Sequence, residues 1–158
     1  MDATLNRVSA RAVFSSAEER IENIAESLTQ NAGGTERDLL SKSLQETLLY
    51  CVGIDTAVSY SQVKTRLTRF LDRQGAPAVI QLFLSLFFFN YVWFETGESF
   101  RAVALSPGEF EKEMESVERI CQRIVASTWE AYEVTERPLD SPAAEELIRD
   151  IEKRLRGE

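Results

Sequence analysis

The sequence predicts an all-α fold, a single-domain bundle of about five to six helices around a central hydrophobic helix at residues 77–95. Apolar residues recur at helical spacing in segments that brief breakers separate. The 158 residues include only seven Gly and four Pro, which leaves few and short loops. No run alternates apolar and polar residues over the length of a strand. The length suits one domain, which we expect to span residues 1–158.

The segment before Thr35 is expected to contain one amphipathic helix. Residues 1–15 should form a loosely ordered arm. A helix then begins near Ser16, which can cap it, and the acidic residues in its first turn suit the helix dipole. Gly33 and Gly34 follow its apolar stripe and are suited to end it.

Two further helices are predicted before the hydrophobic segment. The first begins with Thr35 as N-cap, carries leucines at helical spacing and stops at Gly53. The second begins near Ser59, has one apolar face and ends at Gly75.

Residues 77–94, with the sequence PAVIQLFLSLFFFNYVWF, form the most hydrophobic segment. It is long enough to cross a membrane, so insertion into a bilayer stays open as an alternative. The segment nevertheless contains Gln81, Ser85 and Asn90, and the amphipathic helices on either side need a common apolar partner. We therefore expect a buried central helix that ends near Gly97.

Two helices complete the predicted fold. Ser106 and Pro107 open a long helix as N-cap and first helical residue, and its apolar stripe continues to about Val134. Ser141 and Pro142 open the last helix, which has a narrow apolar stripe. We expect residues 139–158 to form a peripheral C-terminal helix.

Charge and composition exclude several classes of function. The net charge is −8, whereas nucleic-acid binding needs clustered Lys and Arg. The chain contains no His, which removes the commonest general base, the commonest metal ligand and the usual proximal haem ligand. We therefore expect no catalytic residue, cofactor or metal site, and predict that the protein is not an enzyme.

The two cysteines and the first residues point to a cytoplasmic protein. Cys51 and Cys121 lie far apart within apolar helical stripes, so they form neither a disulfide framework nor a zinc site. We expect buried free thiols in a reducing compartment. The first twenty residues lack the apolar core of a secretory signal.

Aromatic side chains beside a few polar groups suggest a pocket on the hydrophobic helix. An apolar small molecule is bound where polar groups converge within an apolar lining. The candidate lining residues are Gln81, Ser85, Phe88, Tyr91 and Trp93. The alternative is that these side chains simply fill the core.

Two charged stripes are candidates for an interaction surface. The basic stripe consists of Arg66, Arg69 and Arg73. The acidic stripe consists of Glu111, Glu115 and Glu118. The arginines are expected to pair with acidic helices, within the fold or across a subunit interface. The acidic stripe could also bind a hard cation or a basic partner, or form a solvated face.

Residues 59–75 resemble the recognition helix of a winged-helix repressor, but over that one helix alone. The distance from Gly53 to Val63 is too long for a tight helix-turn-helix, and the hydrophobic segment stands where a wing hairpin should follow. Binding to DNA is therefore not favoured.

Together these observations favour a non-enzymatic helical protein-interaction module, acting through a protein partner or by self-association. The missing His, the acidic charge and the amphipathic helices support this prediction. One alternative is a sensor or carrier domain that binds an apolar small molecule beside the aromatic helix. The other is a membrane-associated protein that inserts residues 77–94.

Overall fold

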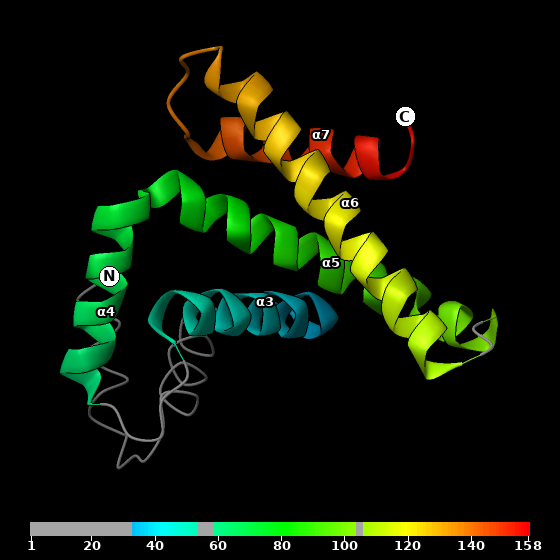
Figure 1. Ribbon diagram of the computed structural model, residues 1–158. Coiled ribbons are helices and arrows are strands. Elements are labelled where there is room, and N and C mark those ends of the chain that lie inside the picture. The colour runs from blue at the N-terminus through cyan, green and yellow to red at the C-terminus, as the bar shows by residue number, and fades with distance from the viewer. Residues whose placement is uncertain (1–32, 54–58, 104–105) are drawn as a thin grey trace. The chain divides into compact units, whose positions relative to one another are not determined.

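The computed structural model describes residues 33–53, 59–103 and 106–158 (Figure 1). Within these ranges the chain is helical and contains no strand, which confirms the predicted all-α class. The predicted arm at residues 1–15 and the helix predicted to begin near Ser16 lie outside the described residues. The described helices are α3 (Gly34–Val52), α4 (Tyr60–Gln74), α5 (Ala76–Val103), α6 (Pro107–Glu133) and α7 (Ser141–Leu155).

Glycine ends both α3 and α4, as the sequence predicted. Gly53 and Gly75 have φ angles of 84° and 81°, in the left-handed region that favours glycine. The N–H of each glycine donates to the carbonyl four residues earlier, on Leu49 and Leu71, at 2.8 Å. These bonds satisfy carbonyl groups that a helix end would otherwise leave without partners.

Ser59 begins α4 with a reciprocal cap. The backbone N–H of Gln62 donates to Ser59 Oγ at 3.2 Å, and the backbone N–H of Ser59 donates to Gln62 Oε1 at 2.6 Å. Ser106 caps α6 by accepting from the N–H of Glu109 at 3.2 Å. The predicted helix start near Ser59 and the predicted N-cap Ser106 are therefore confirmed.

Two other predicted helix starts are wrong by one or two residues. Thr35 lies inside α3, whose N-cap is Gly33 and makes no side-chain capping bond. Asp140, rather than Ser141, caps α7, because its Oδ1 accepts from the N–H of Ala143 at 2.9 Å. An aspartate one position earlier provides the same kind of cap and leaves Pro142 in the first turn.

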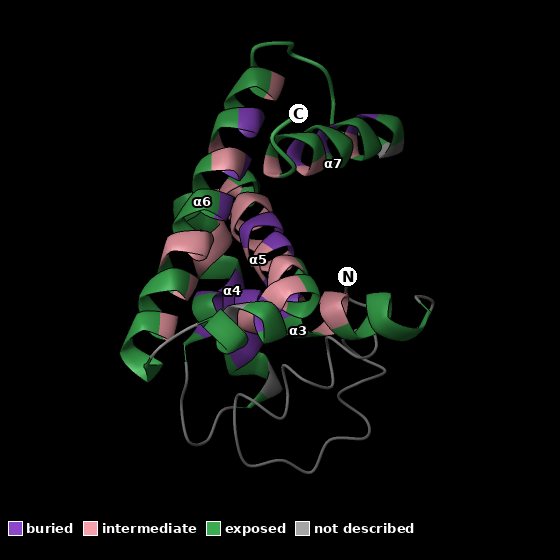
Figure 2. Cartoon of the chain, turned by 90° about the vertical axis from the view of Figure 1, so that its right-hand side faces the viewer, coloured by how far each residue is buried: buried purple, intermediate pink, exposed green. Residues whose placement is uncertain are grey.

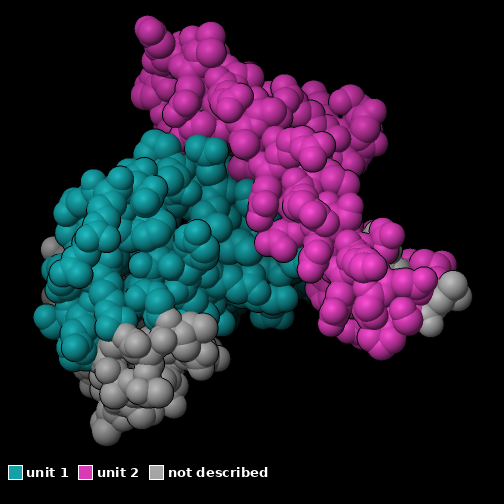
Figure 3. Space-filling view, viewed as in Figure 1, with its two compact units in different colours: residues 1–90 teal, residues 91–158 magenta. Residues whose placement is uncertain are grey.

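Buried residues occur on all five described helices (Figure 2). The chain divides into two compact units, residues 1–90 and 91–158 (Figure 3). In the first unit α3 packs against α4. The first part of α5 adds Val79 and Leu82 to the resulting core, whose buried members are Leu48, Cys51, Val52, Val63 and Leu67.

In the second unit α6 packs against α7. On α7, Ala143 and Ile151 are at 0% exposure and Leu147 is at 4%, whereas Ile148 is 37% exposed. Helix α6 contributes Cys121, Val125 and Trp129 to the buried residues of this unit. The single domain over residues 1–158 and the peripheral position of residues 139–158 stay predictions.

Helix α5 is longer than predicted, because Gly97 lies inside it rather than at its end. Gly97 is buried, and a Cβ atom built there would lie 2.9 Å from Cε3 of Trp93. Glycine is therefore needed at position 97 because the Trp93 indole approaches the backbone closely, and not because the helix ends there. The hydroxyl of Thr96 donates to the carbonyl of Val92 at 2.6 Å and so stays within the helix.

Replacing Gly97 with alanine should lower the free energy of unfolding by about 1 kcal/mol, despite the better helix propensity of alanine. The added methyl group must displace the Trp93 ring, which already packs on Phe110. A Cβ atom added at Gly108, in the first turn of α6, would meet no atom within 4 Å, so Gly108→Ala should instead stabilise slightly. Urea unfolding followed by circular dichroism compares the two. If Gly97→Ala were more stable than the wild type, the Trp93 ring would be free to move away from the added methyl group, which would contradict the prediction.

Candidate interaction surfaces

Helix α5 carries a long uncharged surface. No Asp, Glu, Lys or Arg occurs from Ala76 to Phe94. Among the described residues, Ala76–Ser99 is the one stretch that is long and apolar enough to cross a membrane, as judged by length and composition. Only 17% of its most apolar part is buried, and Figure 2 shows half-buried and exposed residues along the helix. The sequence predicted a buried central helix, whereas α5 is only partly buried over this stretch.

Within the uncharged stretch of α5, the exposed large side chains are aromatic. Phe94 is 57% exposed and Tyr91 is 38% exposed, whereas Phe88 is 1% exposed. Several neighbouring aromatic residues are half-buried, namely Phe83, Phe87, Phe89 and Trp93. Covering apolar area is favourable by about 25 cal/mol per Å², so the exposed aromatic side chains of α5 favour association with another apolar surface.

Asn90 joins α5 to α3 inside the first unit. Its Nδ2 donates to Ser43 Oγ at 3.1 Å and to Glu46 Oε2 at 2.7 Å. Asn90 and Ser43 are almost fully buried, at 1% and 0% exposure. Asn90 Oδ1 is also buried but accepts no hydrogen bond. A buried amide of this kind favours one pairing of the two helices, since a shift would leave further polar groups without partners.

The five predicted pocket residues do not converge. Gln81, Ser85 and Phe88 share one side of α5, because they follow one another at helical spacing. The hydroxyl of Ser85 donates to the carbonyl of Gln81 at 2.8 Å, so it is already satisfied within the helix. Tyr91 and Trp93 are two residues apart and therefore lie on nearly opposite sides of the helix. A single apolar molecule would not meet all five.

Trp93 belongs instead to an aromatic and cationic cluster in the second unit. Its ring packs on Phe110 at 5.3 Å between centroids, in an edge-to-face arrangement. The Arg101 guanidinium lies 5.1 Å from the centroid of the Trp93 ring and 5.8 Å from that of Phe110. The sequence contained a signal for this cluster, because Trp93, Gly97 and Arg101 are four residues apart. Because the helix was predicted to end near Gly97, Arg101 was not expected on the same helix as Trp93.

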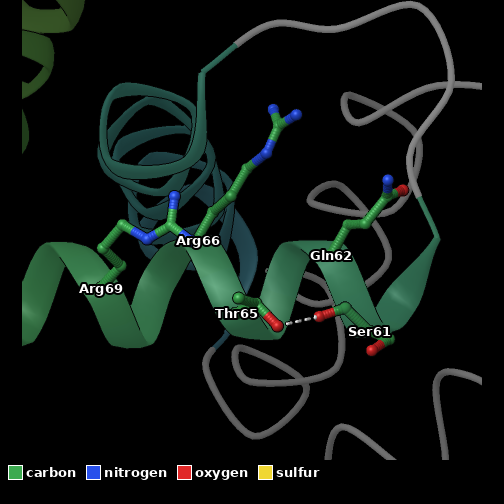
Figure 4. Close-up of a pocket in the computed structure, with 5 residues that line it drawn as sticks. All are labelled: Ser61, Gln62, Thr65, Arg66 and Arg69. Atoms are coloured by element: carbon green, nitrogen blue, oxygen red, sulfur yellow. Dashed lines mark hydrogen bonds between the residues drawn. The ribbon is translucent and has the colours of Figure 1, made fainter.

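The basic stripe lies on α4. Arg66 is half-buried and donates from Nη1 to the carbonyl of Val52 at 3.3 Å, while Arg69 and Arg73 are exposed. Figure 4 shows Arg66 and Arg69 beside an open hollow of about 200 Å³, which is also lined by Ser61, Gln62 and Thr65. The hydroxyl of Thr65 donates to the carbonyl of Ser61 at 2.8 Å and is thus satisfied locally. The charge of this surface suits an acidic partner surface.

The acidic stripe lies on α6. Glu111 is exposed, Glu118 is half-buried, and the side chain of Glu115 is 68% exposed. Glu115 forms a loose ion pair of 3.8 Å with Arg119, one turn further along the same helix. In residues 33–53, 59–103 and 106–158, no group of three or more His, Cys, Asp or Glu side chains could hold a metal ion.

Both cysteines are free and buried. Burial raises the pKa of the Cys51 thiol, and it raises the pKa of Cys121 from 9.0 to about 11. The thiolate is the nucleophilic form of cysteine, so neither side chain suits nucleophilic chemistry at neutral pH.

The raised pKa of Cys121 predicts a pH window for stability. The folded protein holds this proton more tightly than the unfolded chain does, so the contribution is complete below pH 9. It should be lost as the pH rises from 9 to about 11. Urea unfolding at several alkaline pH values measures the loss. Cys121→Ala should show a shallower decline over the same range, and an unchanged decline would contradict the assignment.

Comparison with known proteins identifies no relative. No protein-family model matches the chain, and no curated protein or solved structure reaches the level of a match. The function has to be argued from the surfaces described above.

Proposed function

We propose that this protein is a non-enzymatic helical interaction module that binds protein through the apolar side of α5. The observation that carries the proposal is the uncharged stretch of α5 from Ala76 to Phe94, because only 17% of the most apolar part of the helix is buried. Its exposed aromatic residues, Tyr91 and Phe94, are of the kind enriched in protein interfaces. Elsewhere on the same helix, Leu84 and Phe88 are buried in the protein's own core.

The attachment of α5 to α3 favours a protein partner over a lipid bilayer. Asn90 donates to Glu46, and α3 also carries Lys42, whose Nζ lies 3.9 Å from a Glu46 carboxylate oxygen. Insertion of α5 would either break the bonds of Asn90 or carry these charged side chains into lipid. Both changes are costly, because charges and unpaired polar groups are poorly solvated in hydrocarbon.

The arrangement of polar groups also favours a protein partner over an apolar small molecule. A ligand pocket needs polar side chains that converge on one point. On α5, Ser85 bonds to its own helix and Tyr91 and Trp93 point to different sides. A protein surface can cover separate aromatic side chains along a helix, whereas a small molecule cannot.

Photo-crosslinking in the native cell tests the proposal. Phe94 is replaced by p-benzoylphenylalanine, and the control carries the same group at Lys153, an exposed position on α7. We expect adducts of protein mass at position 94 and far fewer at position 153. Adducts of lipid mass at position 94 would contradict the proposal and favour membrane insertion. A covalent adduct at position 94 of a few hundred daltons, smaller than a membrane lipid, would favour the small-molecule alternative.

A further inference from the structure

We infer that the protein partner is a second copy of this chain, in which the basic stripe of one copy pairs with the acidic stripe of the other. This inference rests on the proposed function and names its partner. The apolar side of α5 provides the association free energy, and the two charged stripes fix the orientation of the copies.

The two stripes match in length and spacing. The basic residues of α4 are separated by three and then four residues, and the acidic residues of α6 by four and then three. When two helices run antiparallel, these orders coincide. Arg66 then faces Glu118, Arg69 faces Glu115 and Arg73 faces Glu111. At about 1.5 Å per residue, each stripe is about 10 Å long.

Two of the three pairs in this match use side chains that are open to solvent. Arg69 and Arg73 are exposed on α4, and Glu111 and Glu115 are exposed on α6. The contact of Glu115 with Arg119 is long and solvated, so an incoming arginine can replace it at little cost. The central and one outer pair of the match are therefore formed by accessible side chains.

Symmetry makes a second copy a suitable occupant. In a two-fold dimer, residue i of one copy contacts residue j of the other, and the reverse contact forms at the same time. One match between stripes thus gives two identical contacts. Exposed ion pairs contribute little affinity but steer the encounter and exclude wrong orientations. They also relieve locally the repulsion between two chains that each carry a net charge of −8.

The apolar character of α5 agrees with such a dimer. Interfaces between identical subunits are more apolar than those between proteins that meet transiently. A surface containing Tyr91 and Phe94 favours aggregation if it stays uncovered. Copies of the chain are synthesised together, so a second copy can cover the surface of Tyr91 and Phe94 as soon as the protein folds.

Charge reversal with mixing tests the inference by native mass spectrometry at low salt. The wild type should appear at twice the chain mass of 17.9 kDa. One variant carries Arg69→Glu and Arg73→Glu, and the other carries Glu111→Lys and Glu115→Lys. Each variant alone places like charges at both contacts and should dimerise about a hundredfold more weakly. In an equimolar mixture, a dimer of one copy of each variant has opposite charges at both contacts, one with the native pairing and one with the pairing reversed. The mixture should therefore recover the dimer.

The recovery in the mixture separates pairing between copies from pairing within one chain, since mixing cannot repair a contact inside a chain. Circular dichroism confirms that each variant keeps its helix content. A monomeric wild type, a dimer that resists both charge reversals, or a mixture that stays monomeric would overturn the inference. If the adducts at position 94 then contain a different protein, the proposed function stands and only the dimer is contradicted. Lipid adducts at position 94 would contradict both the dimer and the proposed function.

Discussion

Replacing Phe88 with alanine is expected to lower the free energy of unfolding by about 3–5 kcal/mol. Phe88 is 1% exposed, and its ring packs edge-to-face on that of Phe87 at 5.4 Å between centroids. Truncation removes the buried ring and leaves a cavity that the surrounding helices can fill only in part.

Phe94 supplies the matched control, since it is the same residue type on the same helix but is 57% exposed. In a monomeric sample, Phe94→Ala should change the unfolding free energy by less than about 1 kcal/mol. Urea denaturation at low protein concentration measures both variants. Equal losses would show that α5 is not buried on the side that carries Phe88.

Replacing Asn90 with aspartate is expected to destabilise the protein by about 2–4 kcal/mol at neutral pH. The introduced carboxylate would lie beside Glu46, whose Oε2 is 2.7 Å from the present Nδ2 of Asn90. Two carboxylates at this distance repel, and the position is 1% exposed, so water cannot solvate the new charge. The bond from Asn90 to Ser43 is lost in the same step.

The loss in Asn90→Asp should shrink as the pH falls. Burial and the neighbouring Glu46 raise the pKa of the introduced carboxyl above its value in the unfolded chain. Its neutral form is therefore favoured in the folded state, and the penalty is present above that folded pKa and relieved below it. Urea unfolding of Asn90→Asp and the wild type at pH 7.5 and pH 5 tests this, and the difference in unfolding free energy should be smaller at pH 5.

Asn90→Leu is the control for this position. Leucine removes the buried Oδ1 that accepts no hydrogen bond, and the hydroxyl of Ser43 keeps its bond to the carbonyl of Leu39 at 2.7 Å. The Glu46 side chain is 37% exposed and can be solvated by water. We expect a change within about 1 kcal/mol. If Asn90→Leu were as damaging as Asn90→Asp, the hydrogen bonds of Asn90 rather than the introduced charge would account for the effect.

Local chemistry explains which helix boundaries could be predicted. Gly53 and Gly75 end helices because their positive φ angles suit glycine alone. Ser59 and Ser106 begin helices because a hydroxyl can accept from the N–H three residues later. These interactions involve neighbours along the chain, so they can be recognised in the sequence.

Interactions between distant residues could not be predicted in the same way. The glycine at position 97 predicted a helix end, but α5 continues through it, and the Trp93 ring occupies the space that a Cβ atom would need. The partners of Asn90 lie more than forty residues away on α3, and no spacing rule connects them. The degree to which α5 is buried depends on how many helices pack against it, which its own composition does not determine.

The candidate site was predicted in part. Exposed charges at Arg69, Arg73, Glu111 and Glu115 agree with the solvated faces that helical spacing indicated. The five candidate pocket residues were grouped by the aromatic composition of α5, without regard to the sides of the helix on which they lie. Helical geometry separates Tyr91 from Trp93 whatever surrounds them.

The position of the two tryptophans makes one half of the chain visible to fluorescence. Trp93 and Trp129 both lie in residues 91–158, while α5 passes without interruption from one unit into the other. Indole emission during heating therefore follows the second unit, and far-ultraviolet circular dichroism follows helices in both. Coincident melting curves would mean that α5 couples the two units into one cooperative transition, and separated curves would give each unit its own melting temperature.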